Sequence, residues 1–198
     1  MTATATVGVL ALQGDFQEHC VALRGLGASV VEVRKAEELD AIDALIIPGG
    51  ESTSMAKLMD AYGMRAPLQA FPRGGRPLWG TCAGLILMAS RLEEDRPEPL
   101  GLMDATVRRN GFGRQIDSFE TELAITGIPG DPVHAVFIRA PVIVETGPGV
   151  ETLAALADDT PVVVRQGNLL ASAFHPELTG DARMHRYFLE MLPVGVVP

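Results

Sequence analysis

One cysteine lies in the part of the sequence best suited to nucleophilic chemistry. Cys82 occupies the centre of a Gly80-x-Cys82-x-Gly84 pattern between two apolar stretches, residues 77–79 and 85–88. This pattern predicts a tight turn from a strand into a helix, in which the two glycines remove Cβ atoms that would crowd the backbone. We expect such a turn to present the Cys82 side chain at the sheet edge, not to bury it.

A helix beginning at Ala83 would support chemistry at the Cys82 sulfur. The unpaired N–H groups and the positive dipole end of a helix favour a thiolate, and they offer hydrogen-bond donors to an oxyanion. A lone cysteine between a strand and a helix is also commonly a small core residue. This segment by itself leaves the nucleophile and the core residue open as alternatives.

A nucleophilic cysteine needs a base and a group that orients the base. His175-Pro176-Glu177 offers both directly after an apolar stretch, residues 169–174, that reads as a buried strand. Residues i and i+2 of an extended chain point to the same side, and Pro176 favours extended geometry at His175. We therefore expect the imidazole and the carboxylate to hydrogen-bond. Alone they could be a surface pair, but together with Cys82 they indicate a catalytic triad.

The elements that must position these groups alternate between strands and helices in the first half of the chain. An apolar stretch at 7–12 predicts a strand covered on both faces, 29–33 alternates like a second strand, 44–47 predicts a third, and helices are predicted at 15–26 and 55–62. This order indicates an α/β fold with a doubly wound, mostly parallel sheet flanked by helices, in which ligands gather at the carboxyl ends of the strands.

Later segments predict a different local pattern. Short strands are expected at 105–108, 120–125, 135–138, 142–145, 153–157, 162–165 and 169–174. They indicate antiparallel strands added to the parallel half. Residues 91–99 are charged and contain two prolines, which predicts a surface loop, and 181–191 predict a last amphipathic helix. With 198 residues and 47% hydrophobic content, we expect one domain spanning 1–198.

Composition excludes several classes of function. The net charge is -9 and Lys and Arg form no block, so we expect no nucleic-acid partner. The apolar stretches are shorter than a membrane-spanning helix requires, and no signal peptide is expected at the N-terminus. The chain has only two cysteines, which suits a reducing compartment and hence the cytoplasm. Cys20 is interpreted as a buried core residue. Metal-ligand spacing is missing, so we expect no metal and no cofactor.

The motifs together resemble a known family. Gly80-Thr81-Cys82-Ala83-Gly84 with Phe174-His175-Pro176-Glu177 resembles the triad-type (class I) glutamine amidotransferases, whose Cys, His and Glu hydrolyse glutamine. More narrowly, the chain is similar to the family of glutaminase subunits of pyridoxal 5'-phosphate synthases. The further segments that carry this similarity are residues 8–14, 48–53, 109–115, 118–120 and 178–185. The resemblance implies a class I glutamine amidotransferase-like, flavodoxin-like fold.

The resemblance also implies roles for individual residues. Cys82, His175 and Glu177 would be catalytic, and the backbone N–H groups of Gly50 and Ala83 would form the oxyanion hole. The residues expected to border L-glutamine are Gly50, Glu51, Ser52, Arg109, Ile138 and Arg139. An arginine there could bind the substrate α-carboxylate in a bidentate manner.

Other motifs remain ambiguous from sequence alone. Residues 48–53 could be an ordinary turn into a helix capped by Ser52 or Thr53. The G-x-G at 111–113 is a weak dinucleotide signal and reads by default as a charged loop. His19, His134 and His185 are interpreted as structural because no paired motif accompanies them. Gln13 has no assigned role.

A partner is implied because a glutaminase of this length carries no second catalytic domain. The resemblance implies a barrel-shaped synthase subunit that makes pyridoxal 5'-phosphate from ribose 5-phosphate, glyceraldehyde 3-phosphate and the released ammonia, in an assembly of twelve plus twelve subunits. Two alternatives remain at this point: a glutaminase for another pathway, such as histidine biosynthesis, and a non-catalytic regulatory protein of the same fold.

Overall fold

The structure is a computed structural model that describes residues 3–109, 118–193 and 196–197. Its centre is a seven-stranded sheet with the order β11-β12-β13-β5-β4-β2-β3. The strands of this sheet are β2 (Thr6–Leu10), β3 (Ser29–Val33), β4 (Ala44–Ile47), β5 (Leu78–Thr81), β11 (Glu151–Ala155), β12 (Pro161–Gln166) and β13 (Leu169–Ser172). The stretch from β13 through β5, β4 and β2 to β3 is parallel, which confirms the predicted mostly parallel sheet.

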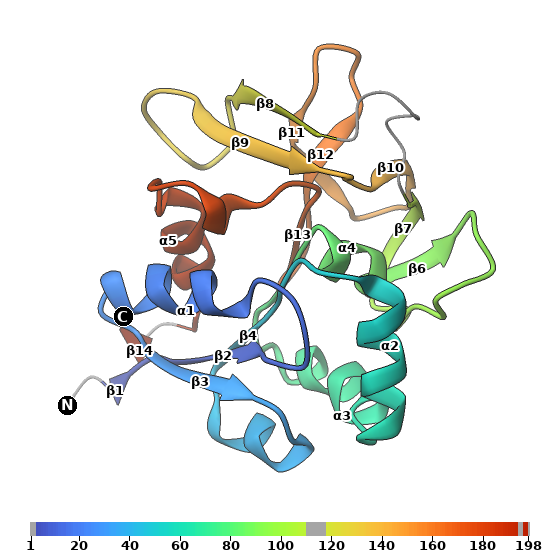
Figure 1. The fold of residues 1–198 in the computed structure, drawn as a ribbon. Helices are drawn as coiled ribbons and strands as arrows, with labels where there is room; N and C mark the ends of the chain where they lie inside the picture. Colours follow the sequence, from blue (N-terminus) through green and yellow to red (C-terminus); the bar gives the residue numbers. More distant parts are fainter. Residues whose placement is uncertain (1–2, 110–117, 194–195, 198) are drawn as a thin grey trace.

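Helices cover both faces of this sheet (Figure 1). The α-helices are α1 (Phe16–Gly25), α2 (Ser52–Ala61), α3 (Arg65–Ala70), α4 (Ala83–Met88) and α5 (Arg183–Glu190), and the 3-10 helices are η1 (Ala36–Ala41), η2 (Phe71–Gly74) and η3 (Pro176–Leu178). Helices α1 and α5 lie on one face, and α2, α3 and α4 lie on the other. The sheet is therefore doubly wound, as its strand and helix order predicts.

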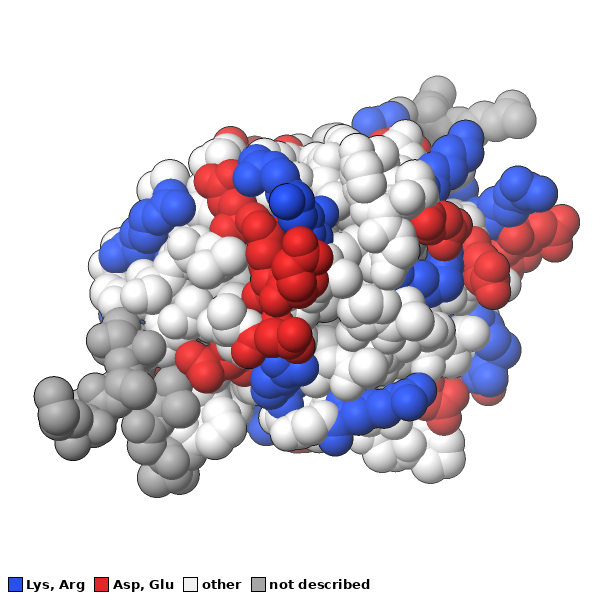
Figure 2. All heavy atoms as spheres, turned by 90° about the horizontal axis from the view of Figure 1, so that it is seen from below, with Lys and Arg blue, Asp and Glu red and all other residues white. Residues whose placement is uncertain are grey.

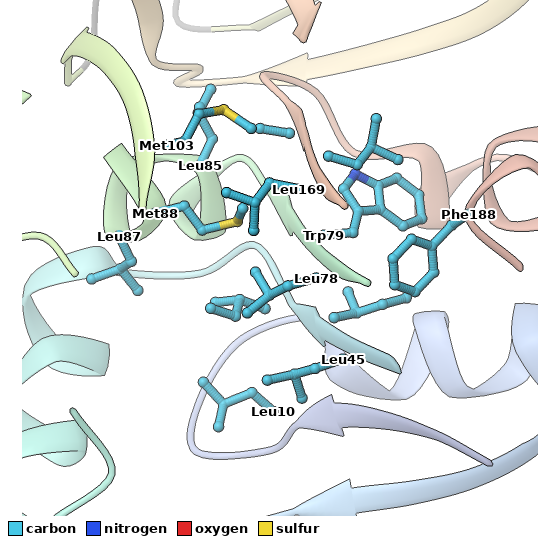
Figure 3. Packing of buried hydrophobic residues seen from close by; sticks show 14 of the residues in the cluster. Leu10, Leu45, Leu78, Trp79, Leu85, Leu87, Met88, Met103, Leu169 and Phe188 are labelled. Atoms are coloured by element: carbon cyan, nitrogen blue, oxygen red, sulfur yellow. The ribbon is translucent and has the colours of Figure 1, made fainter. Parts of the chain in front are cut away.

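Burial of whole strands follows from this double cover. Every residue of β4 and β5 is buried, because both faces of each strand meet helices. Trp79 of β5 packs against Phe188 of α5 with 5.5 Å between ring centroids, and Figure 3 shows the two rings side by side. Leu85 and Met88 of α4 lie with Met103 in another part of the same core.

Smaller sheets are attached to this centre. A three-stranded sheet has the order β10-β7-β6, from β6 (Ala89–Leu92), β7 (Met103–Arg108) and β10 (Val142–Thr146). Strands β8 (Ser118–Leu123) and β9 (Val133–Ile138) form an antiparallel pair, and β1 (Ala3–Thr4) pairs in parallel with β14 (Val196–Val197).

Two expectations for these segments are wrong in part. Residues 91 and 92 belong to β6 and not to a loop, because β6 pairs in parallel with β7, a partner that local composition does not reveal. The strand at 169–174 is shorter than expected and is antiparallel only to β12. Its other neighbour is β5, with which it is parallel, so β13 belongs to the central sheet.

The surface carries charges of both signs. On the face drawn in Figure 2, Asp and Glu side chains gather in a central band, with separate groups of Lys and Arg around it. This face presents no continuous positive surface among the described residues, the feature that binding to a nucleic-acid backbone requires. Within the described part of the chain, no helix has the length and apolar character needed to cross a membrane.

Candidate active site

The turn at Cys82 has the predicted form. Strand β5 ends at Thr81, helix α4 begins at Ala83, and Cys82 itself takes the strained backbone angles φ 48 and ψ -101. A Cβ atom on Gly84 would collide with the carbonyl oxygen of Ile47, and one on Gly80 would meet Gly84. The two glycines therefore let α4 pack directly against β4 and β5.

The expectation that Cys82 is presented and not buried is wrong in one respect. The residue is only 6% exposed, although it lines a cleft. The Cys82 sulfur lies 4.0 Å from the carbonyl oxygen of Ile138, at the end of β9. Strand β9 thus closes over the turn, and this enclosure could not be seen in the local sequence.

His175 and Glu177 form the predicted pair. Nδ1 of His175 lies 2.7 Å from Oε1 of Glu177, and because a carboxylate only accepts, the ring donates this hydrogen bond. The His175 backbone N–H donates to the carbonyl oxygen of Val136 at 2.9 Å, which anchors the segment to β9. The expected extended geometry is wrong: Pro176 begins η3, and this short turn, not a strand, brings the side chains together.

Burial and hydrogen bonding set the charge of this pair. Burial by itself would lower the pKa of His175, but interactions with Cys82 and Glu177 outweigh it and raise that pKa to about 10. Burial raises the pKa of Glu177, and the hydrogen bond with His175 opposes this effect. His175 is therefore protonated at neutral pH, which is the state that can give a proton to a departing amine.

Cys82 and His175 line one cleft of about 420 Å3. All six residues expected to border a substrate line it too: Gly50, Glu51, Ser52, Arg109, Ile138 and Arg139. A larger cleft of about 740 Å3, between α2 and residues 90–99, contains none of the triad residues. Chemistry and not volume therefore identifies the smaller cleft as the candidate site.

The turn after β4 that contains Gly49 and Gly50, here called the glycine turn, fits closely between Gln13 and His175. Gly50 has φ 151, and a Cβ atom on it would lie 2.6 Å from Oε1 of Gln13. A Cβ atom on Gly49 would strike the ring of His175. Only glycine can occupy this turn without displacing Gln13 or the His175 ring.

Glu51 has a structural task in addition to its place in the cleft. Its carboxylate accepts from the N–H groups of Thr53 at 3.1 Å and Ser54 at 2.6 Å, so Glu51 caps α2, and the suggestion that Ser52 or Thr53 is the cap is wrong. Burial tends to raise the pKa of Glu51, but these hydrogen bonds lower it overall. Nη2 of Arg109 lies 3.3 Å from Oε1 of Glu51, which links β7 to α2.

The match to known proteins covers nearly the whole chain. Residues 9–194 fit the SNO glutamine amidotransferase family. These residues include Cys82, His175 and Glu177. The chain belongs to the SNO glutamine amidotransferase family.

Relatives within this family are similar over almost their whole lengths. A Dehalococcoides mccartyi protein named pyridoxal 5'-phosphate synthase subunit PdxT is 57% identical over 187 residues, 93% of this chain and 96% of that protein. A protein of the same name from Parafrankia sp. is 55% identical over 188 residues, 94% of this chain and 92% of that protein. A crystal structure of a glutamine amidotransferase is 53% identical with a TM-score of 0.88 and covers 93% of this chain and 97% of its own.

A more distant structure shares the fold. PurLQS from Thermotoga maritima is 16% identical with a TM-score of 0.69, and the match covers 96% of this chain and 99% of that one. At this identity the likeness concerns the fold alone.

The SNO-family site contains residues that the sequence did not assign. Gln13, Asp15, Ile86 and Leu178 also line the cleft. Oε1 of Gln13 accepts from the Glu51 N–H at 2.8 Å, which ties the end of β2 to the glycine turn. The position of Gln13 and Asp15 just beyond the carboxyl end of a parallel strand was the available signal.

Asp15, His175 and Glu177 bring three possible metal-ligating atoms within 4.8 Å of one another, a grouping that sequence spacing did not predict. Nδ1 of His175 is already bonded to Glu177, and Oδ2 of Asp15 lies 3.5 Å from the same nitrogen. One hydrogen bond and one ion-pair contact therefore account for this grouping. The G-x-G at 111–113 lies outside the described residues.

Proposed function

We propose that residues 1–198 form one glutaminase domain, which hydrolyses L-glutamine to L-glutamate and ammonia and serves as the glutaminase subunit of a pyridoxal 5'-phosphate synthase. One observation carries the glutaminase assignment: Cys82 shares a cleft with His175, whose Nδ1 lies 2.7 Å from Glu177. The names of the relatives at 57% and 55% identity support the synthase assignment over histidine biosynthesis.

In the proposed reaction, the Cys82 thiolate attacks the side-chain amide carbon of glutamine. The N–H groups of Gly50 and Ala83 hold the resulting oxyanion. Protonated His175 gives its proton to the departing nitrogen, the C–N bond breaks, and ammonia leaves a γ-glutamyl thioester at Cys82. Neutral His175 then removes a proton from water, which attacks the thioester and releases glutamate.

The remaining site residues would orient the substrate. Glu177 accepts a hydrogen bond from Nδ1 of His175. This bond orients the ring so that the proton on Nε2 points toward the reacting atoms. Arg109 and Arg139 supply cations for the α-carboxylate of glutamine, and Glu51 and Ser52 lie along the same cleft. Arg109 is held in place by Glu51 and by the carbonyl oxygen of Arg96, 3.0 Å from Nη1.

Ammonia released into water at neutral pH is mostly protonated and is then a poor nucleophile. Direct transfer to a partner avoids this loss. The proposed partner is a barrel-shaped synthase subunit that joins the ammonia to ribose 5-phosphate and glyceraldehyde 3-phosphate, in a cytoplasmic assembly of twelve plus twelve subunits. Pyridoxal 5'-phosphate is then the product of the complex and not a cofactor of this chain.

Glutamate release tests the proposal. Wild type and Cys82→Ala are each assayed with and without the synthase subunit. We expect the synthase subunit to raise wild-type turnover and the Cys82→Ala protein to release no glutamate above the blank. Equal rates for the two proteins would remove Cys82 from the mechanism, and a non-catalytic regulatory protein would release no glutamate in any arm. Stimulation by a histidine-pathway synthase instead would overturn the partner assignment.

A further inference from the structure

A group of fully buried polar side chains lies behind Glu177, on the side away from the cleft. His19 of α1, His185 of α5 and Thr81 of β5 are each 0% exposed. The His19 and His185 rings pack around Trp79, with ring centroids 5.7 Å and 5.2 Å from the indole. Polar side chains in such a core are costly unless they are paired, so their partners show what they do.

The partners form a chain that ends at the triad. Nε2 of His185 lies 2.9 Å from Nδ1 of His19. Nε2 of His19 lies 3.1 Å from the Thr81 hydroxyl and 3.3 Å from Oε2 of Glu177. That oxygen is the one that His175 does not use, and among the described residues no group meets it with good hydrogen-bond geometry.

Proton positions in this chain can be assigned by elimination. If His19 carried its proton on Nδ1, the lone pair on its Nε2 would face the carboxylate oxygen of Glu177. His185 would then carry its own proton on Nδ1. That nitrogen has no partner among the described residues, so it would be an unpaired buried N–H. The reverse assignment removes the first cost and leaves Nδ1 of His185 with an unpaired lone pair in place of an unpaired N–H. His185 then donates from Nε2 to His19, and His19 donates from Nε2 to the Thr81 hydroxyl, while Oε2 of Glu177 lies 3.3 Å from the same nitrogen.

Both histidines remain neutral in this arrangement. Burial, with the nearby His185 and His175, holds the pKa of His19 well below its usual range, and burial lowers the pKa of His185 to about 4. A neutral donor can fix a carboxylate without cancelling its charge. Glu177 thus keeps its negative charge for the His175 imidazolium.

We propose that His19, oriented by His185, is a positioning residue that holds the second oxygen of the Glu177 carboxylate and thereby the ring of His175. Only the kinetic test of this inference rests on the proposed glutaminase function. It makes the site a chain of five side chains, Cys82, His175, Glu177, His19 and His185. Two of them reach the site from the first and last helices.

Two substitutions at His19 separate positioning from packing. In His19→Gln, the side-chain amide lies near the position of the His19 Nε2 and keeps a donor toward Glu177. In His19→Asn, the shorter amide reaches only the position of Nδ1, so the donor toward Glu177 is lost. Both remove the ring that packs on Trp79. We expect His19→Gln to stay within about threefold of wild-type kcat and His19→Asn to lose about 10- to 100-fold in kcat with little change in KM.

A second readout does not need turnover. The His175 imidazole is titrated by NMR in the chain alone, where the ionisable groups facing the His175–Glu177–His19 unit are Cys82, Asp15 and His185. We expect the His175 pKa to fall in His19→Asn and to hold in His19→Gln, because a poorly held carboxylate stabilises the imidazolium less. This shift is expected even if wild type fails to hydrolyse glutamine, so the two proposals fail separately.

The inference is overturned if the two variants lose kcat equally, or if the His175 pKa is the same in both. If His19→Asn does not fold, the comparison moves to His185, where Gln keeps the Nε2 donor to His19 and Asn loses it. A selective loss in His185→Asn supports the proposal. Equal behaviour of His185→Asn and His185→Gln refutes it.

Discussion

The charge on the His175 imidazole decides which part His175 can take in the proposed hydrolysis of glutamine. His175 is 4% exposed and Glu177 is 7% exposed, so water screens their interaction little. The pKa of His175 is raised to about 10 because Cys82 and Glu177 outweigh the cost of burial. In the proposed mechanism, this imidazolium protonates the nitrogen that leaves glutamine.

This charge state predicts a pH dependence. Because His175 acts as an acid in the proposed formation of the thioester, kcat/KM should fall as pH rises through about 10, where the imidazolium is lost. Glu177→Gln removes the anion that stabilises the imidazolium, so its alkaline limb should move to lower pH. We also expect kcat to fall by about 10²- to 10⁴-fold, as for the orienting acid of other triads.

Glutaminase pH profiles check this prediction. Glu190→Gln, an exposed acid on α5, is the matched control and should keep both the rate and the profile. An unchanged alkaline limb in Glu177→Gln would show that Glu177 does not set the protonation of His175.

At the level of elements, close packing of α4 on β4 and β5 places Cys82, the proposed nucleophile. The turn leaves no room for side chains at Gly80 and Gly84, and Cys82 takes a backbone conformation with positive φ. Strain of this kind persists only where the surroundings hold it. The short helix, buried along its whole length, provides that support.

Alanine substitutions at two glycines test this packing. Gly84→Ala would push a Cβ atom into the backbone of β4, and we expect it to lower the free energy of unfolding by about 2–3 kcal/mol. Gly25→Ala is the control, because Gly25 lies in the last turn of α1 with open space around its Cα. We expect it to raise stability by about 0.5–1 kcal/mol. Denaturant unfolding measures both, and equal effects would contradict the packing argument.

Across the whole molecule, the pairing of β13 with β5 joins the two halves of the site. Ser172 pairs with Thr81, and the Cys82 N–H donates to the carbonyl oxygen of Ser172 at 2.9 Å. Nε1 of Trp79 donates to the Ser172 hydroxyl at 3.2 Å, a buried bond between residues 93 positions apart. Residues near the two catalytic motifs thus hold the strands together.

Loss of this long-range bond should destabilise the fold. Ser172→Ala leaves the buried indole N–H of Trp79 without its acceptor, and we expect a loss of about 1–3 kcal/mol in the free energy of unfolding. Ser29→Ala, at an exposed position on β3, should change stability by less than about 0.5 kcal/mol. Denaturant unfolding checks this prediction too, and a neutral Ser172→Ala would show that the indole finds another partner.

The sequence by itself determined the turn at Cys82 and the pairing of His175 with Glu177, although not the 3-10 turn η3 that brings this pair together. The pattern around Cys82 predicted a strand, turn and helix, His175 and Glu177 predicted a bonded pair, and continuous apolar stretches predicted strands buried on both faces. Each of these depends on backbone preferences and side-chain periodicity over a few neighbouring residues, which a sequence states directly.

Only the tertiary structure decided what encloses and supports the triad. The burial of Cys82 by β9, the capping of α2 by Glu51, and the contact of His19 with His185, 166 positions apart, were not predicted. Local sequence cannot give such contacts, because they depend on the order and pairing of strands and on which helix faces meet across the sheet. His19 and His185 look like unrelated residues until α1 and α5 pack on the same face.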